Sequence, residues 1–200
     1  NAAGKNQVLA LSTPWAISYD VMDGTELWRF GGINGEVTPS PIFAGGNFFV
    51  ITPYEALYAI KPDGQGDVSK THLAWSTDEW VPDICSPVSN GDLIFTLMSS
   101  GLLTCFDIKD GKKQWEHDFR IDFQASPSIV DNCLYLLGQR GQVIILEVGR
   151  QFKELARSDL AETLDASPAF AHDRIYIRGI KSLFCIGEKP LIESHPPRTQ

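Results

Sequence analysis

The chain consists mainly of short runs of aliphatic, β-branched and aromatic residues, separated by clusters of turn-forming residues. The run Phe-Phe-Val-Ile at 48–51 follows Gly45-Gly46, and the apolar run at 133–137 follows Asp131-Asn132. Such runs predict strands, and Gly, Asn and Asp between them predict tight hairpin turns. The spacing of an amphipathic helix does not occur along the chain. The pattern therefore predicts an all-β fold.

A repeat of about 40 residues organises these runs. It consists of the dipeptide Ser-Pro, a turn-forming pair, and an aromatic residue nine positions after the serine. The serines are Ser40, Ser86, Ser126 and Ser167, and the aromatic residues are Phe49, Phe95, Tyr135 and Tyr176. Proline has no N–H, so it belongs at the start or edge of a strand. We therefore expect the innermost strand of each repeat to precede and include Ser-Pro.

Each repeat predicts four short strands. A hairpin follows Ser-Pro, and a third strand follows at 56–60, 102–108, 143–148 and 182–186. The fourth strand ends in a large apolar residue such as Trp28, Trp75 or Trp115. Four strands about every 40 residues are typical of a β-propeller blade, which buries both faces only by stacking on its neighbours. The predicted fold is a β-propeller of four-stranded antiparallel blades.

The repeat also predicts the boundaries of about four and a half blades. The predicted parts are a partial blade at 6–33, blades at 36–78, 81–119 and 123–160, and a partial blade at 164–187. Residues 188–200, which include three prolines, are expected to form a disordered tail. Propellers of the family that this repeat resembles usually close with seven or eight blades. We therefore expect the chain to be the C-terminal part of a larger propeller, or a piece of a ring that another chain completes.

Two turns carry a more specific motif. Asp107, Gly111, Lys112 and Trp115 form one copy, and the segment from Asp20 through Gly24 to Trp28 forms another. The motif resembles the pyrroloquinoline-quinone-like propeller repeat, and the resemblance extends from about residue 7 to residue 187. It implies that the repeated tryptophans Trp28, Trp75 and Trp115 are structural docking residues between neighbouring blades.

The resemblance also bears on function. Quinoprotein dehydrogenases of this family require vicinal cysteines, an Asp base and a calcium site, and this chain has no adjacent cysteines. It therefore resembles the non-catalytic branch, which includes the outer-membrane-assembly lipoprotein and uncharacterised secreted bacterial members. This implies a periplasmic or secreted scaffold that presents loops to a protein, peptide or carbohydrate, with no cofactor. The alternatives are a fragment of a quinone- and calcium-dependent alcohol or sugar dehydrogenase, and a sensor ectodomain.

Net charge and composition limit the classes of partner that the chain could bind. The net charge of −8 argues against nucleic acid, because binding there rests on neutralising phosphates with Lys and Arg. No apolar run approaches the ~20 residues that a membrane helix needs. The four cysteines (Cys85, Cys105, Cys133 and Cys185) show no C-x-x-C spacing, and we expect all four to be buried thiols.

Polar residues just upstream of the Ser-Pro dipeptides are candidates for a ligand site at the axial mouth of the propeller. They are Glu36, Thr38, Asp83, Asp122, Gln124 and Asp165. Their convergence predicts a site for a cation or a hydroxyl-rich ligand, and the alternative is that they line a water-filled channel. Trp80 and Arg120 lie six residues before Ser86 and Ser126, in the loops that enter these repeats. Trp80 could stack on a planar ligand such as a sugar, and the alternative is that it anchors its loop.

A weaker metal candidate lies in the segment 61–67. Asp63 and Asp67 flank flexible glycines, and oxygen-rich loops of this kind can bind calcium. The segment does not fit the twelve-residue calcium loop, so the alternative is a plain glycine-rich turn. The histidines show no metal-ligand pairing, and no hydrolase or phosphate-binding motif is present.

Overall fold

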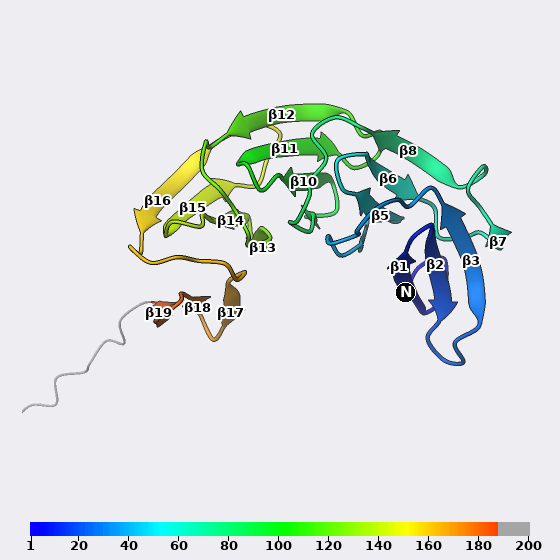
Figure 1. The fold of residues 1–200 in the computed structure, drawn as a ribbon, viewed down its shortest axis with the longest axis horizontal. Coiled ribbons are helices and arrows are strands. Elements are labelled where there is room, and N and C mark those ends of the chain that lie inside the picture. Colours follow the sequence, from blue (N-terminus) through cyan, green and yellow to red (C-terminus); the bar gives the residue numbers. More distant parts are fainter. Residues whose placement is uncertain (188–200) are drawn as a thin grey trace, which may run out of the picture.

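The chain folds into five β-sheets arranged side by side as an open arc (Figure 1). The structure is a computed structural model and describes residues 1–187. The nineteen strands include every regular element found in this part of the chain. The predicted all-β fold, a partial β-propeller with four-stranded blades, is confirmed. The predicted tail at 188–200 lies outside the described residues.

The first sheet contains β1 (Gln7–Ser12), β2 (Trp15–Asp20), β3 (Glu26–Gly31) and β7 (Gly66–Asp67). The second contains β4 (Ile42–Ala44), β5 (Asn47–Thr52), β6 (Ala56–Ile60) and β8 (Leu73–Thr77). The third contains β9 (Val88–Ser89), β10 (Leu93–Leu97), β11 (Leu102–Asp107) and β12 (Lys113–Asp118). The fourth contains β13 (Ser128–Val130), β14 (Cys133–Leu137), β15 (Gln142–Glu147) and β16 (Glu154–Asp159). The fifth contains β17 (Ala169–Ala171), β18 (Arg174–Arg178) and β19 (Leu183–Gly187).

The hairpins form where the turn-forming pairs predict them. Gly45 and Gly46 connect β4 to β5 with φ angles of 54° and 84°, and Asp131 begins the β13–β14 turn with φ of 52°. Positive φ at these sites matches the twist of a two-residue hairpin. The predicted start of the innermost strand was wrong. The strands begin after the prolines, at Ile42, Val88, Ser128 and Ala169, because proline has no N–H to pair in a ladder.

The hydrophobic core lies between the sheets. Phe49 and Ile51 of the second sheet pack with Ile94 and Phe106 of the third. The second, third and fourth sheets therefore bury one face against the sheet before them and the other against the sheet after them, as propeller blades do. The outer strands β8, β12 and β16 lie on the convex rim of the arc (Figure 1), and every residue of β16 is exposed.

The segment 61–72 differs from the predicted glycine-rich turn. It reaches back to the first sheet, where Gly66 and Asp67 pair in parallel with Trp28 and Arg29. The Ser69 hydroxyl accepts a hydrogen bond from the Gly31 N–H at 2.7 Å. This segment covers the outer edge of β3, so the first sheet has four strands instead of the three that the repeat predicts.

The expectation of four buried cysteines is only partly correct. Cys85 and Cys105 are buried, and burial raises the pKa of each thiol to about 12. Cys133 is half-buried, whereas Cys185 on β19 is exposed because no further strand among residues 1–187 pairs with this edge. Within the same residues, no helix is long and apolar enough to cross a membrane.

Candidate functional site

One face of the arc carries most of the candidate residues. Strands that follow one another along the chain within a blade run antiparallel, so the turns between second and third strands lie on the same face as the connections from one sheet to the next. We call this the loop face. It comprises the turns 53–55, 98–101, 138–141 and 179–182 and the connections 32–41, 78–87, 119–127 and 160–168.

Asp83 is the most constrained residue of the loop face. Its side chain is only 8% exposed and accepts hydrogen bonds from the Ser99 N–H (2.9 Å), the Ser99 hydroxyl (2.5 Å) and the Tyr54 hydroxyl (3.1 Å). Burial acts to raise the pKa of Asp83, but the bonds from Ser99 and Tyr54 outweigh it and hold the pKa below its usual value. Tyr54 comes from the second sheet and Ser99 from the third. Asp83 therefore joins two neighbouring turns.

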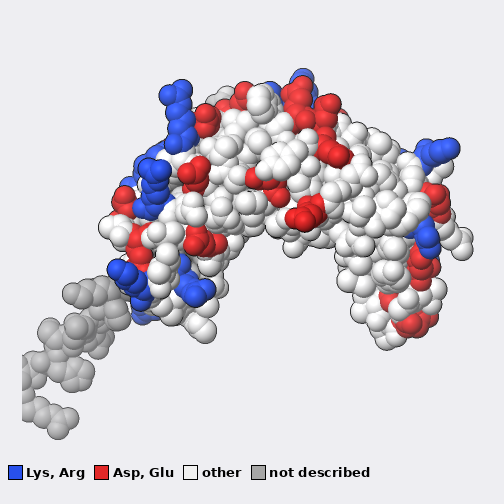
Figure 2. All heavy atoms as spheres, in the orientation of Figure 1, with Lys and Arg blue, Asp and Glu red and all other residues white. Residues whose placement is uncertain are grey.

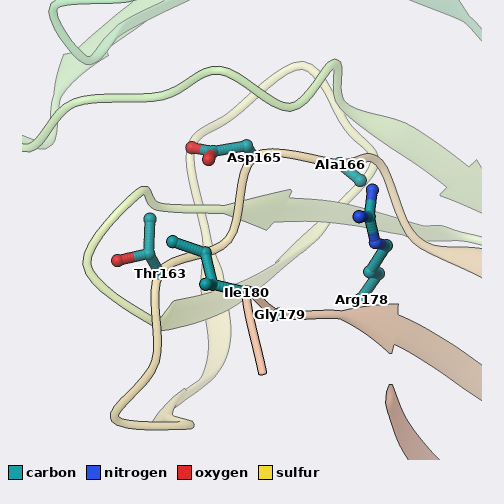
Figure 3. A pocket seen from close by; sticks show the side chains of 6 residues that line it. All are labelled: Thr163, Asp165, Ala166, Arg178, Gly179 and Ile180. Atoms are coloured by element: carbon teal, nitrogen blue, oxygen red, sulfur yellow. The ribbon is translucent and has the colours of Figure 1, made fainter. Parts of the chain in front are cut away.

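Asp165 makes a similar link at the other end of the arc. Gln139, in the turn of the fourth sheet, donates its side-chain N–H to the Asp165 carboxylate at 3.1 Å. Asp165 lines a hollow of about 170 Å³ with Thr163, Ala166, Arg178, Gly179 and Ile180 (Figure 3). The close view shows Arg178 reaching up from the end of β18 toward Ala166, on the opposite side of the hollow from Thr163.

The remaining axial candidates are exposed. They are Glu36, Thr38, Asp122, Gln124 and Arg120. Asp122 contributes its carbonyl oxygen, which accepts the Gln139 N–H at 2.8 Å, and Arg120 adopts a positive φ of 56°. The structure thus engages the side chains of Asp83 and Asp165 in links between turns and leaves the other polar side chains facing solvent.

Trp80 contacts the start of the outer strand β12. It is 44% exposed, and the Lys113 ammonium at the start of the outer strand β12 lies 5.8 Å from its ring centroid. Lys113 is also 3.7 Å from the Glu79 carboxylate and 2.8 Å from that of Glu116. Trp80 and the 73% exposed Tyr54 both have positive φ, 57° and 61°, so each ring is presented from a fixed turn.

Serines of the Ser-Pro dipeptides form a ladder between the sheets, and the sequence analysis missed this role. The N–H of Ser40 donates to the Ser86 hydroxyl, and the N–H of Ser86 donates to the Ser126 hydroxyl, both at 2.9 Å. The Ser167 hydroxyl donates to the Ser126 carbonyl at 3.1 Å. A hydroxyl repeated once per blade at the start of an apolar strand was the signal that could have predicted the ladder.

Two of the three candidate docking tryptophans bond to the next sheet. The Trp75 indole N–H donates to the Ile108 carbonyl at 2.9 Å, and that of Trp115 donates to the Gly149 carbonyl at 3.0 Å. Trp28 instead donates to Gln7 in its own sheet at 2.9 Å, while its ring lies 5.7 Å from Phe48 of the second sheet. All three rings lie at sheet boundaries.

The side chains of the two candidate calcium ligands, Asp63 and Asp67, have different partners. Asp67 accepts two hydrogen bonds from Ser69, at 3.0 Å and 2.6 Å, whereas Asp63 lies 3.6 Å from the His72 ring. Within residues 1–187, no group of three or more His, Cys, Asp or Glu side chains is arranged to hold a metal ion.

Charge is spread unevenly over the arc. On the face shown in Figure 2, Lys and Arg are prominent at the end formed by the fourth and fifth sheets. Asp and Glu are prominent over the middle of the arc and at the end formed by the first sheet. Both ends also carry groups of the opposite sign, so on this face they differ in the balance of charge.

These features define a partial β-propeller with a hydrogen-bonded loop face. Residues 13–189 match the family model described as outer membrane protein assembly factor BamB, and the chain belongs to this family. The resemblance to the pyrroloquinoline-quinone-like repeat family, in its BamB-like branch, is confirmed by this match. A search of curated proteins gives no match.

Solved structures agree on the fold. BamB from Moraxella catarrhalis is similar with a TM-score of 0.67 and 14% identity, covering 90% of this chain and 56% of that one. The computationally designed Ika8 protein has a TM-score of 0.64 and 11% identity, covering 86% and 54%. The quinohemoprotein alcohol dehydrogenase ADHIIG from Pseudomonas putida HK5 has a TM-score of 0.57 and 15% identity, covering 76% and 29%. The chain thus spans little more than half the length of the first two proteins.

Proposed function

We propose that this chain is part of a non-enzymatic propeller scaffold that binds a protein partner through its loop face. The observation that carries the proposal is the set of hydrogen bonds by which Asp83 joins the turns of Tyr54 and Ser99. A surface held in this way loses little conformational entropy when it binds, which favours affinity.

The exposed aromatic residues supply the contact area. Binding energy at protein interfaces is concentrated in a few residues, and Trp, Tyr and Arg are enriched among them. Tyr54 and Trp80 belong to neighbouring parts of the loop face, because Tyr54 bonds to Asp83, three residues after Trp80. The exposed polar residues Glu36, Asp122, Gln124, Asp165 and Arg120 provide polar contacts elsewhere on the same loop face, as polar residues do outside the anchors of an interface.

Membership of the BamB family supports a cellular location and a class of partner for this scaffold. We propose a periplasmic or secreted protein whose partner takes part in outer-membrane protein assembly, with a peptide or a carbohydrate as further ligand classes. We also propose that the blade boundaries follow the repeat, at 36–78, 81–119 and 123–160, with partial blades at 6–33 and 164–187. Further blades or a second chain would complete the ring.

Site-specific photo-cross-linking tests this function. A photoreactive phenylalanine analogue replaces Trp80 or Tyr54, and a control places it at Leu155 on the exposed outer strand β16. In cells of the source organism, we expect a discrete cross-linked protein from the two loop-face positions and none from Leu155. Equal products at all three positions, or none at any, would contradict the proposal.

The dehydrogenase alternative has its own test. Pyrroloquinoline quinone is titrated in the presence and absence of calcium while the fluorescence of the five tryptophans is followed. A scaffold without this cofactor shows no saturable quenching. Calcium-dependent quenching at micromolar quinone would favour the enzyme and overturn the scaffold proposal.

A further inference from the structure

Two Asn-Gly dipeptides lie in turns of the chain. Asn34 and Gly35 belong to the connection from the first sheet to the second, and Asn90 and Gly91 belong to the hairpin between β9 and β10. All of these residues are exposed. Asparagine deamidates readily before glycine, because glycine has no side chain to hinder its own backbone nitrogen. By sequence alone the two sites are therefore equally reactive.

Deamidation proceeds through a cyclic succinimide. The backbone nitrogen of the glycine loses its proton to water and attacks the side-chain carbonyl carbon of the asparagine, so a new C–N bond forms. The bond from that carbon to the side-chain nitrogen breaks, and this nitrogen takes up a proton and leaves as ammonia. Water then opens the ring at either carbonyl group, which gives an aspartate or an isoaspartate. The reaction therefore requires a mobile asparagine side chain and a glycine nitrogen that no hydrogen bond holds in place.

Hydrogen bonds hold Asn90 and Gly91 away from this reaction. The Asn90 side-chain oxygen accepts the N–H groups of Asp92 and Leu93, at 3.1 Å and 2.8 Å. The Gly91 N–H donates to the Ser89 hydroxyl at 3.0 Å. An Asx-turn of this kind fixes the asparagine side chain, and the bond to Ser89 fixes the nitrogen that would attack it. We therefore expect Asn90 to react only when the hairpin opens.

Asn34 and Gly35 lack these restraints within residues 1–187. The Gly35 N–H has no acceptor there. The Asn34 side chain makes one bond, in which its nitrogen, the leaving group of the reaction, donates to the Glu55 carboxylate at 2.9 Å. A single bond of this kind contributes little net stability, so it opens often and leaves the Asn34 side chain free to rotate.

We propose that Asn34 is a site of spontaneous deamidation and isoaspartate formation in the folded protein, and that Asn90 is protected. The change acts on the loop face. A carboxylate at position 34 has no N–H for Glu55 and repels it, so the link between the connection 32–41 and the turn that carries Tyr54 is lost. An isoaspartate also adds a methylene group to the main chain beside Gly35, whose carbonyl accepts the Thr13 hydroxyl at 2.7 Å. This modification site does not depend on the protein-binding role proposed for the loop face.

Peptide mapping by mass spectrometry tests the proposal on the folded chain after incubation in mildly alkaline buffer. We expect Asn34 to deamidate at least ~10-fold faster than Asn90, the factor that corresponds to breaking the bonds that hold Asn90 and Gly91. In urea, where these bonds are absent, the two rates should become equal. Equal rates in the folded chain, or a faster rate at Asn90, would overturn the proposal.

A substitution at the protected site tests the cause of the difference. Ser89→Ala removes the acceptor of the Gly91 N–H, so deamidation at Asn90 should accelerate several-fold while the rate at Asn34 stays the same. Circular dichroism verifies that the variant folds. An unchanged rate at Asn90 would contradict the protective role of these bonds, on which the proposal rests.

The effect on the loop face is measured with a homogeneous product. Asn34→Asp reproduces the aspartate form, and hydrogen–deuterium exchange of the Glu55 N–H, which donates to the Thr52 carbonyl at 3.0 Å, should then be faster than in the unmodified chain. Asn90→Asp is the control, because an aspartate oxygen can accept the same two N–H groups, and it should leave this exchange unchanged. Equal exchange in all three proteins would overturn the effect on the turn of Tyr54.

Discussion

Ser86 donates its backbone N–H to the hydroxyl of Ser126 across the boundary between the third and fourth sheets, at 2.9 Å. The Ser40 N–H makes the same bond to Ser86 one sheet earlier. These bonds join the inner ends of adjacent blades, where the prolines have no N–H to offer. The Ser-Pro repeat therefore carries a hydrogen-bond ladder around the inner side of the arc.

Replacing one serine of this ladder should destabilise the fold. Ser126→Ala removes the acceptor of the partly buried Ser86 N–H, which should lower the free energy of unfolding by about 1–2 kcal/mol. Urea denaturation measures the change. Ser158→Ala on the exposed strand β16 is the control and should change stability by less than ~0.5 kcal/mol. Equal effects of the two substitutions would show that the ladder contributes nothing.

The carboxylate of Asp83 should make the free energy of unfolding depend on pH. Its folded pKa lies below the usual carboxyl value, so its contribution is fully present above the unfolded pKa and is lost as pH falls through the folded pKa. Asp83→Asn should lower stability at pH 7 by roughly 1.5–3 kcal/mol, the usual worth of bonds to a charged group, and should flatten stability below pH 4. Denaturant titrations at a series of pH values measure both effects. Asp122→Asn, at an exposed carboxylate, is the control and should change stability at pH 7 by less than ~0.5 kcal/mol.

Alanine substitutions at two glycines in equivalent turns should distinguish the cost of backbone strain from the cost of a steric clash. Gly24 and Gly111 have φ of 73° and 71°, but a Cβ at Gly24 meets open space whereas one at Gly111 would lie 2.5 Å from the Trp75 ring. Gly24→Ala should therefore cost about 1 kcal/mol through strain alone. Gly111→Ala should cost a further ~1–3 kcal/mol by displacing Trp75 from the boundary between the second and third sheets. Equal losses in thermal or urea unfolding would mean that Trp75 does not pack tightly there.

The buried and exposed cysteines should differ in their rates of alkylation. Burial raises the pKa of Cys85 and Cys105 to about 12, so neither forms a thiolate near neutral pH, whereas Cys185 is exposed. Iodoacetamide at pH 8 followed by peptide mass spectrometry should modify Cys185 first and leave Cys85 and Cys105 unmodified until the protein unfolds. Early modification of Cys85 in the folded protein would contradict its burial.

The sequence predicted the sheets well because their signals are local. Residues with positive φ form the turn of each first hairpin, as at Gly45-Gly46 and Asp131. The alternation of Phe49 and Val50 assigns the two faces of a strand to different neighbouring sheets. β7 could not be predicted in this way. Its two residues, Gly66 and Asp67, are exposed and carry no apolar pattern, and their pairing with β3 depends on a contact distant in sequence.

The candidate site was predicted less well than the fold. The upstream position of Asp83 indicated a place near the axis, but only the structure brings Tyr54 and Ser99 to its carboxylate. Trp80 was expected at the axial mouth, and its contact with Lys113 instead directs it toward the outer strand β12. Hydrogen bonds between turns depend on side-chain placement across blades, which the spacing of a repeat does not encode.

Binding of the cross-linked partner to the purified chain tests the central claim most directly. Isothermal titration calorimetry compares the unmodified chain with Tyr54→Ala, Trp80→Ala and Leu155→Ala, the last of which removes a side chain about as exposed as Trp80 from β16. If the loop face is the binding surface, each aromatic substitution weakens binding by about 10-fold or more, and Leu155→Ala leaves it unchanged. Unchanged affinity in all three variants would contradict a loop face that binds protein.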